Sequence, residues 1–315
     1  MDASKERISK IVKAAKLYYQ LDYSQQQVAK ELGVSRPSVS RLLQEAKEQG
    51  IVQIQIFDPY ESEQKSAELI KEKYGLKECI VVNVPMFDDE VIKEYIGKKA
   101  GEYVHNIIQD GDIIGVTWGT TVYEVAKNVE AKRVNGVEVV QLNGGVSHSE
   151  TNTYSSEVLH LLGNAFHSPP HFLPLPAVVD HLVVKKAIVE DRHIRRVLEL
   201  GKKANIALFT VGDPNEDSTL VKAGYFTKDD LNKLYEKKAV ADICSRFFDI
   251  NGNICCDEID SRTISIDLDE LKEKETSLLA AGGRNKVEGI IGALNGKFAN
   301  VLVTDQFTAQ FLIDD

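Results

Sequence analysis

The first 57 residues show the spacing of three helices followed by a strand. Apolar residues over 4–19 recur every three or four positions, which predicts an amphipathic helix. The same spacing over 25–32 and 36–49, each preceded by a serine that can cap a helix and followed by a glycine that can end one, predicts two short helices. Alternation of apolar and polar residues over 51–56 predicts a strand.

Two short helices joined by a glycine turn and followed by a strand are the pattern of a winged helix-turn-helix. In that motif the second short helix lies in the major groove of DNA. Its outward positions carry side chains that hydrogen-bond to bases and phosphates, so we expect operator DNA to be contacted by Arg36, Ser38, Ser40, Arg41, Gln44 and Lys47. A plain helical hairpin with a solvated polar face is the alternative.

A second pattern begins beyond Asp58 and Pro59, where proline and acidic residues interrupt the first. Apolar runs that predict strands lie at 79–84, 113–117, 137–142, 206–211, 277–281 and 301–304, and helices are expected near 89–109, 120–130, 154–166, 183–199, 228–238, 285–294 and 306–313. Most of these runs are apolar on both faces, which indicates a parallel sheet covered by helices, an α/β domain. We therefore expect a DNA-binding domain over 1–57 and an effector-binding and oligomerisation domain over 58–315.

The distribution of charge agrees with this division. The 315 residues carry a net charge of −10, yet residues 1–57 hold nine Lys+Arg and six Asp+Glu, and the remaining 258 residues carry a net charge of −13. The net positive charge of residues 1–57 favours binding to the negatively charged phosphate backbone of DNA. No apolar run reaches the roughly 18 residues needed to cross a bilayer, so we expect a cytoplasmic protein without a membrane partner. The four cysteines lack the spacing of a zinc site, so we expect neither a metal nor a cofactor.

Three glycine turns follow predicted strands, where parallel sheets bind ligands. They are Thr-Trp-Gly-Thr-Thr over 117–121, Asn-Gly-Gly-Val-Ser over 143–147 and Gly-Gly-Arg-Asn-Lys over 282–286. Hydroxyls, cations and the free N–H groups at the start of a helix suit a phosphate. None of the turns has the glycine pattern of a dinucleotide or nucleoside triphosphate site. Together they predict a site for an anionic small molecule.

Over nearly its whole length the chain resembles the SorC family of bacterial sugar-responsive transcription regulators. The resemblance rests on residues 23–29 and 35–43 of the head and on 118–121, 141–145, 242–249, 281–283 and Lys286 of the body. Within the family, residues 137–154 are similar to the deoxyribonucleoside regulators. The resemblance implies a winged helix-turn-helix on an α/β domain similar to sugar-phosphate isomerases and deaminases, assembled as a homodimer or tetramer. It also implies effector contacts at Gly119, Thr120, Thr121, Asn143, Gly144, Asp242, Arg246 and Lys286.

One departure from the family pattern concerns the effector. Members that respond to deoxyribose 5-phosphate can carry lysine where this chain has Asn143, and that amine can form a Schiff base with the open-chain aldehyde. Asparagine cannot. Either the same sugar phosphate is held here without a covalent bond, or the effector differs.

The resemblance implies a repressor of a sugar or deoxyribonucleoside catabolic operon whose operator affinity is altered by a phosphorylated sugar such as deoxyribose 5-phosphate. The alternative is an enzyme, a sugar-phosphate isomerase or deaminase, in which Asp180 and Asp242 could act as bases. Residues 1–57 favour the regulator, because such an enzyme has no reason to carry a basic helix-turn-helix.

Overall fold

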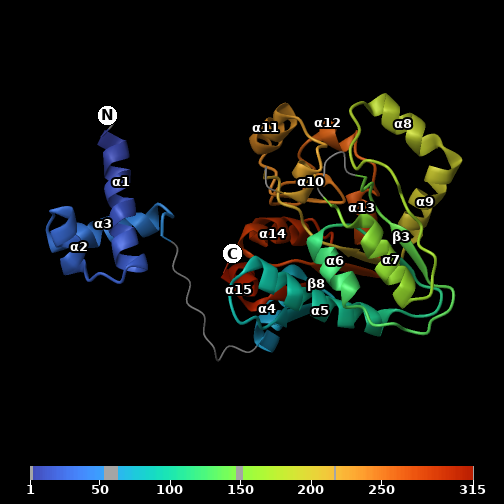
Figure 1. The fold of residues 1–315 in the computed structure, drawn as a ribbon, viewed down its shortest axis with the longest axis horizontal. Coiled ribbons are helices and arrows are strands. Elements are labelled where there is room, and N and C mark those ends of the chain that lie inside the picture. Colours follow the sequence, from blue (N-terminus) through green and yellow to red (C-terminus); the bar gives the residue numbers. More distant parts are fainter. Residues whose placement is uncertain (1–2, 53–62, 147–151, 216–217, 315) are drawn as a thin grey trace. The chain divides into compact units, whose positions relative to one another are not determined.

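The computed structural model describes residues 3–52, 63–146, 152–215 and 218–314. The chain divides into two compact units, Met1–Asp58 and Pro59–Asp315 (Figure 1). Each unit has its own hydrophobic core, and the two are described separately below.

The small unit consists of three helices, α1 (Ala3–Ala15), α2 (Gln25–Leu32) and α3 (Arg36–Glu48), with a π-helical turn η1 (Lys16–Gln20) at the end of α1. A capping box begins α2, because Ser24 and Gln27 each accept a hydrogen bond from the backbone N–H of the other. Gly33, with φ +64°, ends it in the left-handed region. The three predicted helices are confirmed. The predicted wing strand over 51–56 lies outside the described residues, except for a bend at 51–52.

Six parallel strands form the sheet of the large unit. They are β1 (Glu78–Val82), β2 (Ile113–Val116), β3 (Glu138–Gln141), β4 (Ile206–Phe209), β7 (Thr276–Ala280) and β8 (Val301–Asp305). Their order is β1-β8-β7-β4-β2-β3, with every neighbouring pair parallel. All six predicted strands are confirmed, as is the α/β class, because strands buried on both faces leave a clear run of apolar residues.

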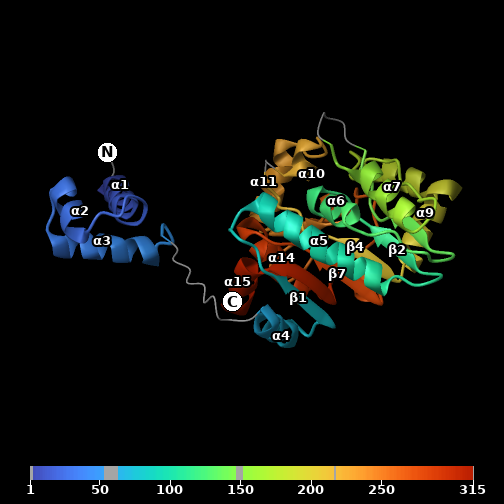
Figure 2. The same ribbon diagram turned by 60° about the horizontal axis from the view of Figure 1, so that its bottom comes forward.

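Helices cover both faces of this sheet. They are α4 (Glu63–Tyr74), α5 (Asp89–Ile107), α6 (Thr120–Lys127), α7 (Ser155–Ala165), α14 (Val287–Asn295) and α15 (Gln306–Asp314). One core joins the sheet to α4, α14 and α15, and a second joins it to α5, α6 and α7. Figure 2 shows the long helix α5 lying along the sheet. Alternate residues of β4 belong to opposite cores, since Ala207 and Phe209 pack in the first and Ile206 and Leu208 in the second.

The remaining elements lie between the sheet strands in sequence. They are α8 (Leu182–Glu190), α9 (Arg192–Lys203), α10 (Thr219–Lys222), α11 (Lys228–Glu236), an antiparallel hairpin of β5 (Ala241–Ile243) and β6 (Arg246–Phe248), α12 (Asp257–Asp260), α13 (Leu268–Lys272) and the 3-10 turn η2 (Arg284–Lys286). The prediction of one helix over 183–199 is wrong. Asp191 separates α8 from α9 and caps the latter by accepting from the N–H groups of His193 and Ile194. Within the described ranges, no helix combines the length and apolarity needed to cross a membrane.

Candidate functional site

The polar face of α3 carries most of the side chains expected to contact DNA. Arg36, Ser40, Gln44 and Lys47 recur at steps of four and three, so they share one face of the helix, with Arg41 beside them. All five side chains are exposed. The opposite face holds the apolar residues that fix the helix, Val39, Leu43 and Ala46, each buried.

Two contacts refine this face. Ser38 is half-buried, and its hydroxyl is hydrogen-bonded to that of the cap residue Ser35 at 2.8 Å. Glu45 is held by Arg7 of α1, whose Nη2 lies 2.6 Å from the Glu45 Oε1. That pairing compensates a carboxylate that would otherwise repel a phosphate backbone.

In the large unit, a cavity of about 250 Å³ lies at the carboxyl ends of β2, β4 and β7. It is lined by residues of 117–121, 210–213 and 281–286, which follow these three strands, and by the β5–β6 hairpin. Loops that follow neighbouring parallel strands meet at one edge of the sheet, so the topology itself brings distant turns together.

Six of the eight residues that the family resemblance implies as effector contacts line this cavity. They are Gly119, Thr120, Thr121, Asn143, Asp242 and Lys286. Gly144 and Arg246 do not line it, and both have structural roles instead. The sequence did not single out Thr210 or Asp213, which follow β4, nor Asp89 and Lys93 of α5, although all four line the cavity. Thr210 falls inside the run 206–211 that predicts a strand, and Gly212, which follows that run, was not singled out as a turn.

One part of the cavity is suited to an anion. Helix α6 begins directly after Gly119, whose φ of +126° only glycine adopts readily, and no side chain caps that helix. Its first N–H groups therefore lack a capping side chain at the start of a helix, where the dipole favours negative charge. The Lys286 ammonium also lines the cavity and donates to the Val211 carbonyl at 2.5 Å. Burial lowers the Lys286 pKa.

A buried carboxylate lies on the hairpin side of the cavity. Asp242 is only 7% exposed, and burial raises its pKa to about 6. Its Oδ2 accepts a hydrogen bond from the N–H of Ser245 at 3.0 Å. Gly212 makes room for it, because a Cβ at that position would overlap Asp242 Oδ1.

The β5–β6 turn orients the neighbouring amide. Cys244 and Ser245 are the two turn residues, with φ of +54° and +64°, a left-handed pair that non-glycine residues rarely adopt. Strain of this kind persists where surrounding contacts require it, and it clusters at functional sites. Here the Ser245 Oγ accepts from Asn143 Nδ2 at 3.2 Å, which turns the Asn143 Oδ1 away from the hairpin. Burial raises the pKa of the Cys244 thiol to about 12, so it is not a nucleophile at neutral pH.

Buried oxygens without a hydrogen-bond partner gather at this cavity. Among the described residues, six buried side-chain oxygens lack such a partner, and four of them belong to lining residues: Thr117, Asn143, Thr210 and Asp242. Folded proteins rarely leave buried polar atoms unpaired, so their clustering here indicates a place for a polar ligand.

Gly144 packs closely, and both of its backbone polar groups have partners within the protein. Its carbonyl accepts from Trp118 Nε1 at 2.7 Å, and its N–H donates to the Ile264 carbonyl at 2.9 Å. A Cβ at this position would overlap the backbone of Pro176. Glycine therefore lets residues 143–145 lie against a neighbouring segment.

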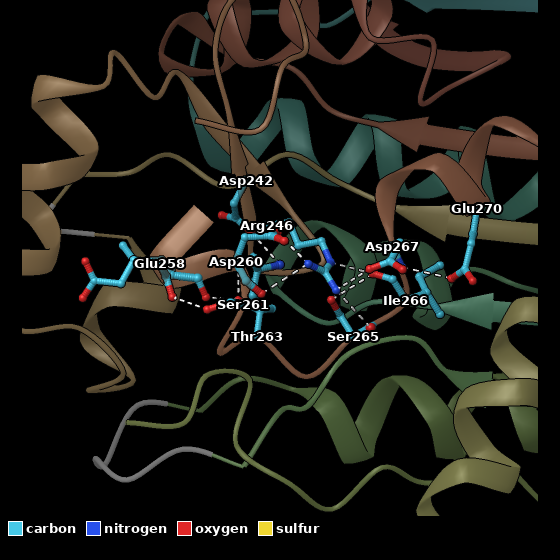
Figure 3. Close-up of polar contacts among 12 residues, drawn as sticks. Asp242, Arg246, Glu258, Asp260, Ser261, Thr263, Ser265, Ile266, Asp267 and Glu270 are labelled. Carbon is cyan, nitrogen blue, oxygen red and sulfur yellow. Dashed lines mark hydrogen bonds and ion pairs between the residues drawn. The ribbon is translucent and has the colours of Figure 1, made fainter. Parts of the chain in front are cut away.

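Arg246 is fixed by partners outside the cavity, as Figure 3 shows. Its buried guanidinium forms ion pairs with Asp260 at 2.5 Å and Asp267 at 2.6 Å, and its Nε donates to the Ile266 carbonyl at 2.8 Å. These bonds hold the segment whose Ser265 forms a β-bridge with Asn143. Arg246 thus supports the site without entering it.

Of the two carboxylates named as bases for the enzyme alternative, Asp242 lines the cavity and Asp180 is not among the lining residues. Among the described residues, no histidine lines the cavity, and none of their side chains form a group of three metal ligands.

Comparisons with known proteins agree with both units. The family model described as "Putative sugar-binding domain" matches residues 58–314, and that of the Crp-like helix-turn-helix domain matches residues 7–59. The deoxyribonucleoside regulator of Bacillus subtilis (strain 168) is 52% identical over all 315 residues and its own full length. The sorbitol operon regulator of Klebsiella pneumoniae is 32% identical over 96% of this chain and 97% of its own. The crystal structure of the full-length sorbitol operon regulator SorC from that organism has a TM-score of 0.74 at 30% identity, covering 98% and 99% of the two chains.

Proposed function

Because this chain belongs to the SorC family of sugar-binding transcription regulators, we propose that it represses a sugar or deoxyribonucleoside catabolic operon in response to a phosphorylated sugar. Deoxyribose 5-phosphate is the effector we favour. The family models and the relatives are those of DNA-binding regulators and not of enzymes. A regulator that binds operator DNA acts where the DNA is, so the proposal includes a cytoplasmic location.

The observation that carries the proposal is the division of the cavity into two kinds of lining. The uncapped start of α6 at Gly119 and the Lys286 ammonium suit a phosphate. The unpaired oxygens of Asn143 and Asp242 suit the hydroxyl groups of a sugar. A phosphorylated sugar has both features in one small molecule.

Removal of the Lys286 charge tests the phosphate part of the proposal. A charge-assisted hydrogen bond contributes about 1.5–3 kcal/mol, so Lys286→Ala should weaken binding of deoxyribose 5-phosphate at least about tenfold and leave binding of deoxyribose unchanged. Lys127→Ala, which removes an exposed lysine of α6 outside the cavity lining, is the control. Calorimetry measures each affinity. Equal affinities of the wild type for the sugar and its phosphate would contradict the phosphate site.

Noncovalent binding is a separate part of the proposal. Asn143 has no amine, and the Lys286 amine is hydrogen-bonded to the Val211 carbonyl. Borohydride reduction in the presence of deoxyribose 5-phosphate should therefore add no mass to the protein. A trapped adduct in the mass spectrum would establish a Schiff base on a lysine and overturn this part.

We also propose that the protein acts as a homodimer or tetramer on a palindromic operator. One helix-turn-helix binds only a half-site, and two related copies are needed for the full site. Bound effector would release the operator by changing the relative placement of the two DNA-binding units in the oligomer. Sedimentation at micromolar concentration tests the assembly, and a monomer with and without DNA would contradict it.

A further inference from the structure

Two threonines follow directly after the carboxyl ends of neighbouring strands. Thr117 directly follows β2, and Thr210 directly follows β4. Val116 pairs with Leu208 in the sheet, and the Thr117 N–H donates to the Leu208 carbonyl at 3.1 Å. Both threonines line the cavity.

The hydroxyl oxygens of both threonines are buried without a hydrogen-bond partner among the described residues. Thr117 is 5% exposed as a whole residue. A buried hydroxyl that loses its hydrogen bonds to water destabilises a fold. Valine has almost the same shape and carries no such penalty, so packing alone does not account for threonine at two adjacent strand ends.

Two other unpaired oxygens belong to residues that line the same cavity. The amide oxygen of Asn143 and the Oδ1 of Asp242 line the same cavity and are likewise buried. Ionised carboxylate and amide oxygens only accept hydrogen bonds, whereas threonine hydroxyls both donate and accept. A ligand that satisfies all four must therefore offer several groups that donate and accept, which describes the hydroxyls of a sugar.

A third threonine provides an internal contrast. Thr304 of β8 is fully buried, and its hydroxyl also lacks a partner among the described residues, yet it does not line the cavity. It shares the burial and chemistry of Thr117 but has no access to a ligand. Thr304 thus separates an effect on binding from an effect on packing.

We propose that Thr117 and Thr210 determine the specificity of the effector site by binding hydroxyl groups of the sugar and not its phosphate. This inference rests on the proposed function, and it assigns the sugar-recognising part of the site to residues that follow β2 and β4. A site built to hydrogen-bond a hydroxyl discriminates strongly against an analogue that lacks it, because the buried protein groups are then left unpaired.

The test combines three valine variants with one rescue variant. Calorimetry first shows which of 2-deoxyribose 5-phosphate and ribose 5-phosphate the wild type binds more tightly. Thr117→Val and Thr210→Val should each lower the affinity for that ligand about tenfold or more. Thr304→Val should bind it as the wild type does. Thr117→Ser keeps the hydroxyl and should restore affinity to within a few-fold of the wild type. Without ligand, all three valine variants should unfold at the wild-type temperature or above it, because each loses an unpaired buried hydroxyl.

Three outcomes would overturn the inference. If both Thr117→Val and Thr210→Val bind the sugar phosphate as the wild type does, the two hydroxyls do not bind the sugar and serve the fold or a bound water. The proposed function would still stand. An equal loss in Thr304→Val would show a packing effect. If neither sugar phosphate binds the wild type, the proposed function fails and this inference fails with it.

Discussion

The polar face of α3 and the effector cavity both present polar side chains, but they differ in how deeply these are buried. On α3, Arg36, Arg41 and Lys47 are exposed, and separate apolar residues on the other face hold the helix in place. In the cavity, Asp242 and Thr117 are buried, and each has an oxygen without a partner in the described structure. The α3 side chains are exposed, whereas the cavity oxygens are buried and lack a protein partner among the described residues.

In the small unit, a substitution on the polar face of α3 can therefore change DNA binding without changing stability. In the large unit, a substitution of a buried cavity residue should change ligand binding and stability together. An exposed arginine can be removed with little effect on the free energy of unfolding. A buried unpaired oxygen destabilises the ligand-free fold, so its removal should increase stability while weakening ligand binding. Four predictions test this comparison, from the largest expected effect to the smallest.

The largest effect is expected at a glycine beside the cavity. Gly144→Ala would place a Cβ 2.6 Å from the carbonyl carbon of Pro176, and backbone cannot move aside as a flexible side chain can. The free energy of unfolding should fall by about 3 kcal/mol. The single tryptophan, Trp118, bonds to the Gly144 carbonyl, so its fluorescence during urea unfolding reports this unit.

Gly33→Ala in the small unit is the matched control. Gly33 also needs its conformation, with φ +64°, but a Cβ there meets nothing within 4 Å. Only the left-handed strain remains, which is about 1–2 kcal/mol. Far-UV circular dichroism detects that loss in the helices. If Gly144→Ala and Gly33→Ala lower the free energy of unfolding equally, close packing around Gly144 adds nothing to the effect of the substitution.

The second prediction concerns Asp242. Because burial raises its pKa to about 6, above an unfolded value of about 3.9, the native state binds more protons than the unfolded state between these values. Its contribution to stability is therefore complete below pH 4 and is lost as pH rises through 6. Asp242→Asn should be more stable than the wild type at pH 7 by an amount on the order of 2–3 kcal/mol, and by little at pH 4. Tryptophan fluorescence at both pH values measures the gap, which would be constant if another group were responsible.

The third prediction concerns the exposed face of α3. Arg36→Ala and Arg41→Ala should each weaken specific operator binding by about 1–3 kcal/mol if the arginine binds a base in the major groove. Their unfolding free energies should stay within about 0.5 kcal/mol of the wild type. Lys47→Ala should weaken binding evenly on wild-type and scrambled operators, as a phosphate contact does. Footprinting measures the affinity of each variant for the wild-type and the scrambled operator. If an arginine variant loses the same affinity for both sequences, that arginine does not recognise bases.

The smallest effect is expected at a helix cap. Ser24→Ala removes the side-chain half of the capping box of α2 and should lower the stability of the small unit by about 1 kcal/mol. Circular dichroism during thermal unfolding measures the change, and Trp118 fluorescence should not respond. A parallel response of both probes would mean that the two units unfold together.

The sequence predicted most of the sheet because burial on both faces leaves continuous apolar runs. It missed the β5–β6 hairpin, since each strand has three residues and the turn Cys244-Ser245 does not resemble the Asn-Gly pair typical of such turns. The single helix expected over 183–199 failed for another reason. Apolar spacing continues across Asp191, and the spacing alone does not show that this carboxylate caps a new helix.

The site was predicted in part for similar reasons. Glycine turns after strands marked Gly119, Asn143 and Lys286, and the topology brings them to one cavity. Thr210 falls inside the apolar run 206–211, so the sequence pattern assigned it to a strand and not to the site. The family resemblance implied an effector contact at Arg246, and the sequence did not show that its guanidinium pairs with Asp260 and Asp267, 14 and 21 residues later.

The strained turn at Cys244-Ser245 has a consequence for protein engineering. Replacement by Asn-Gly would suit the two positive φ values and should make the hairpin easier to form. The same change would delete the serine hydroxyl that accepts from Asn143, leaving that amide free to rotate and to present its NH₂ group to the sugar. A directed-evolution library selected for heat resistance would therefore enrich variants with a weakened response to the effector. Selection on a reporter operon would have to accompany the thermal screen.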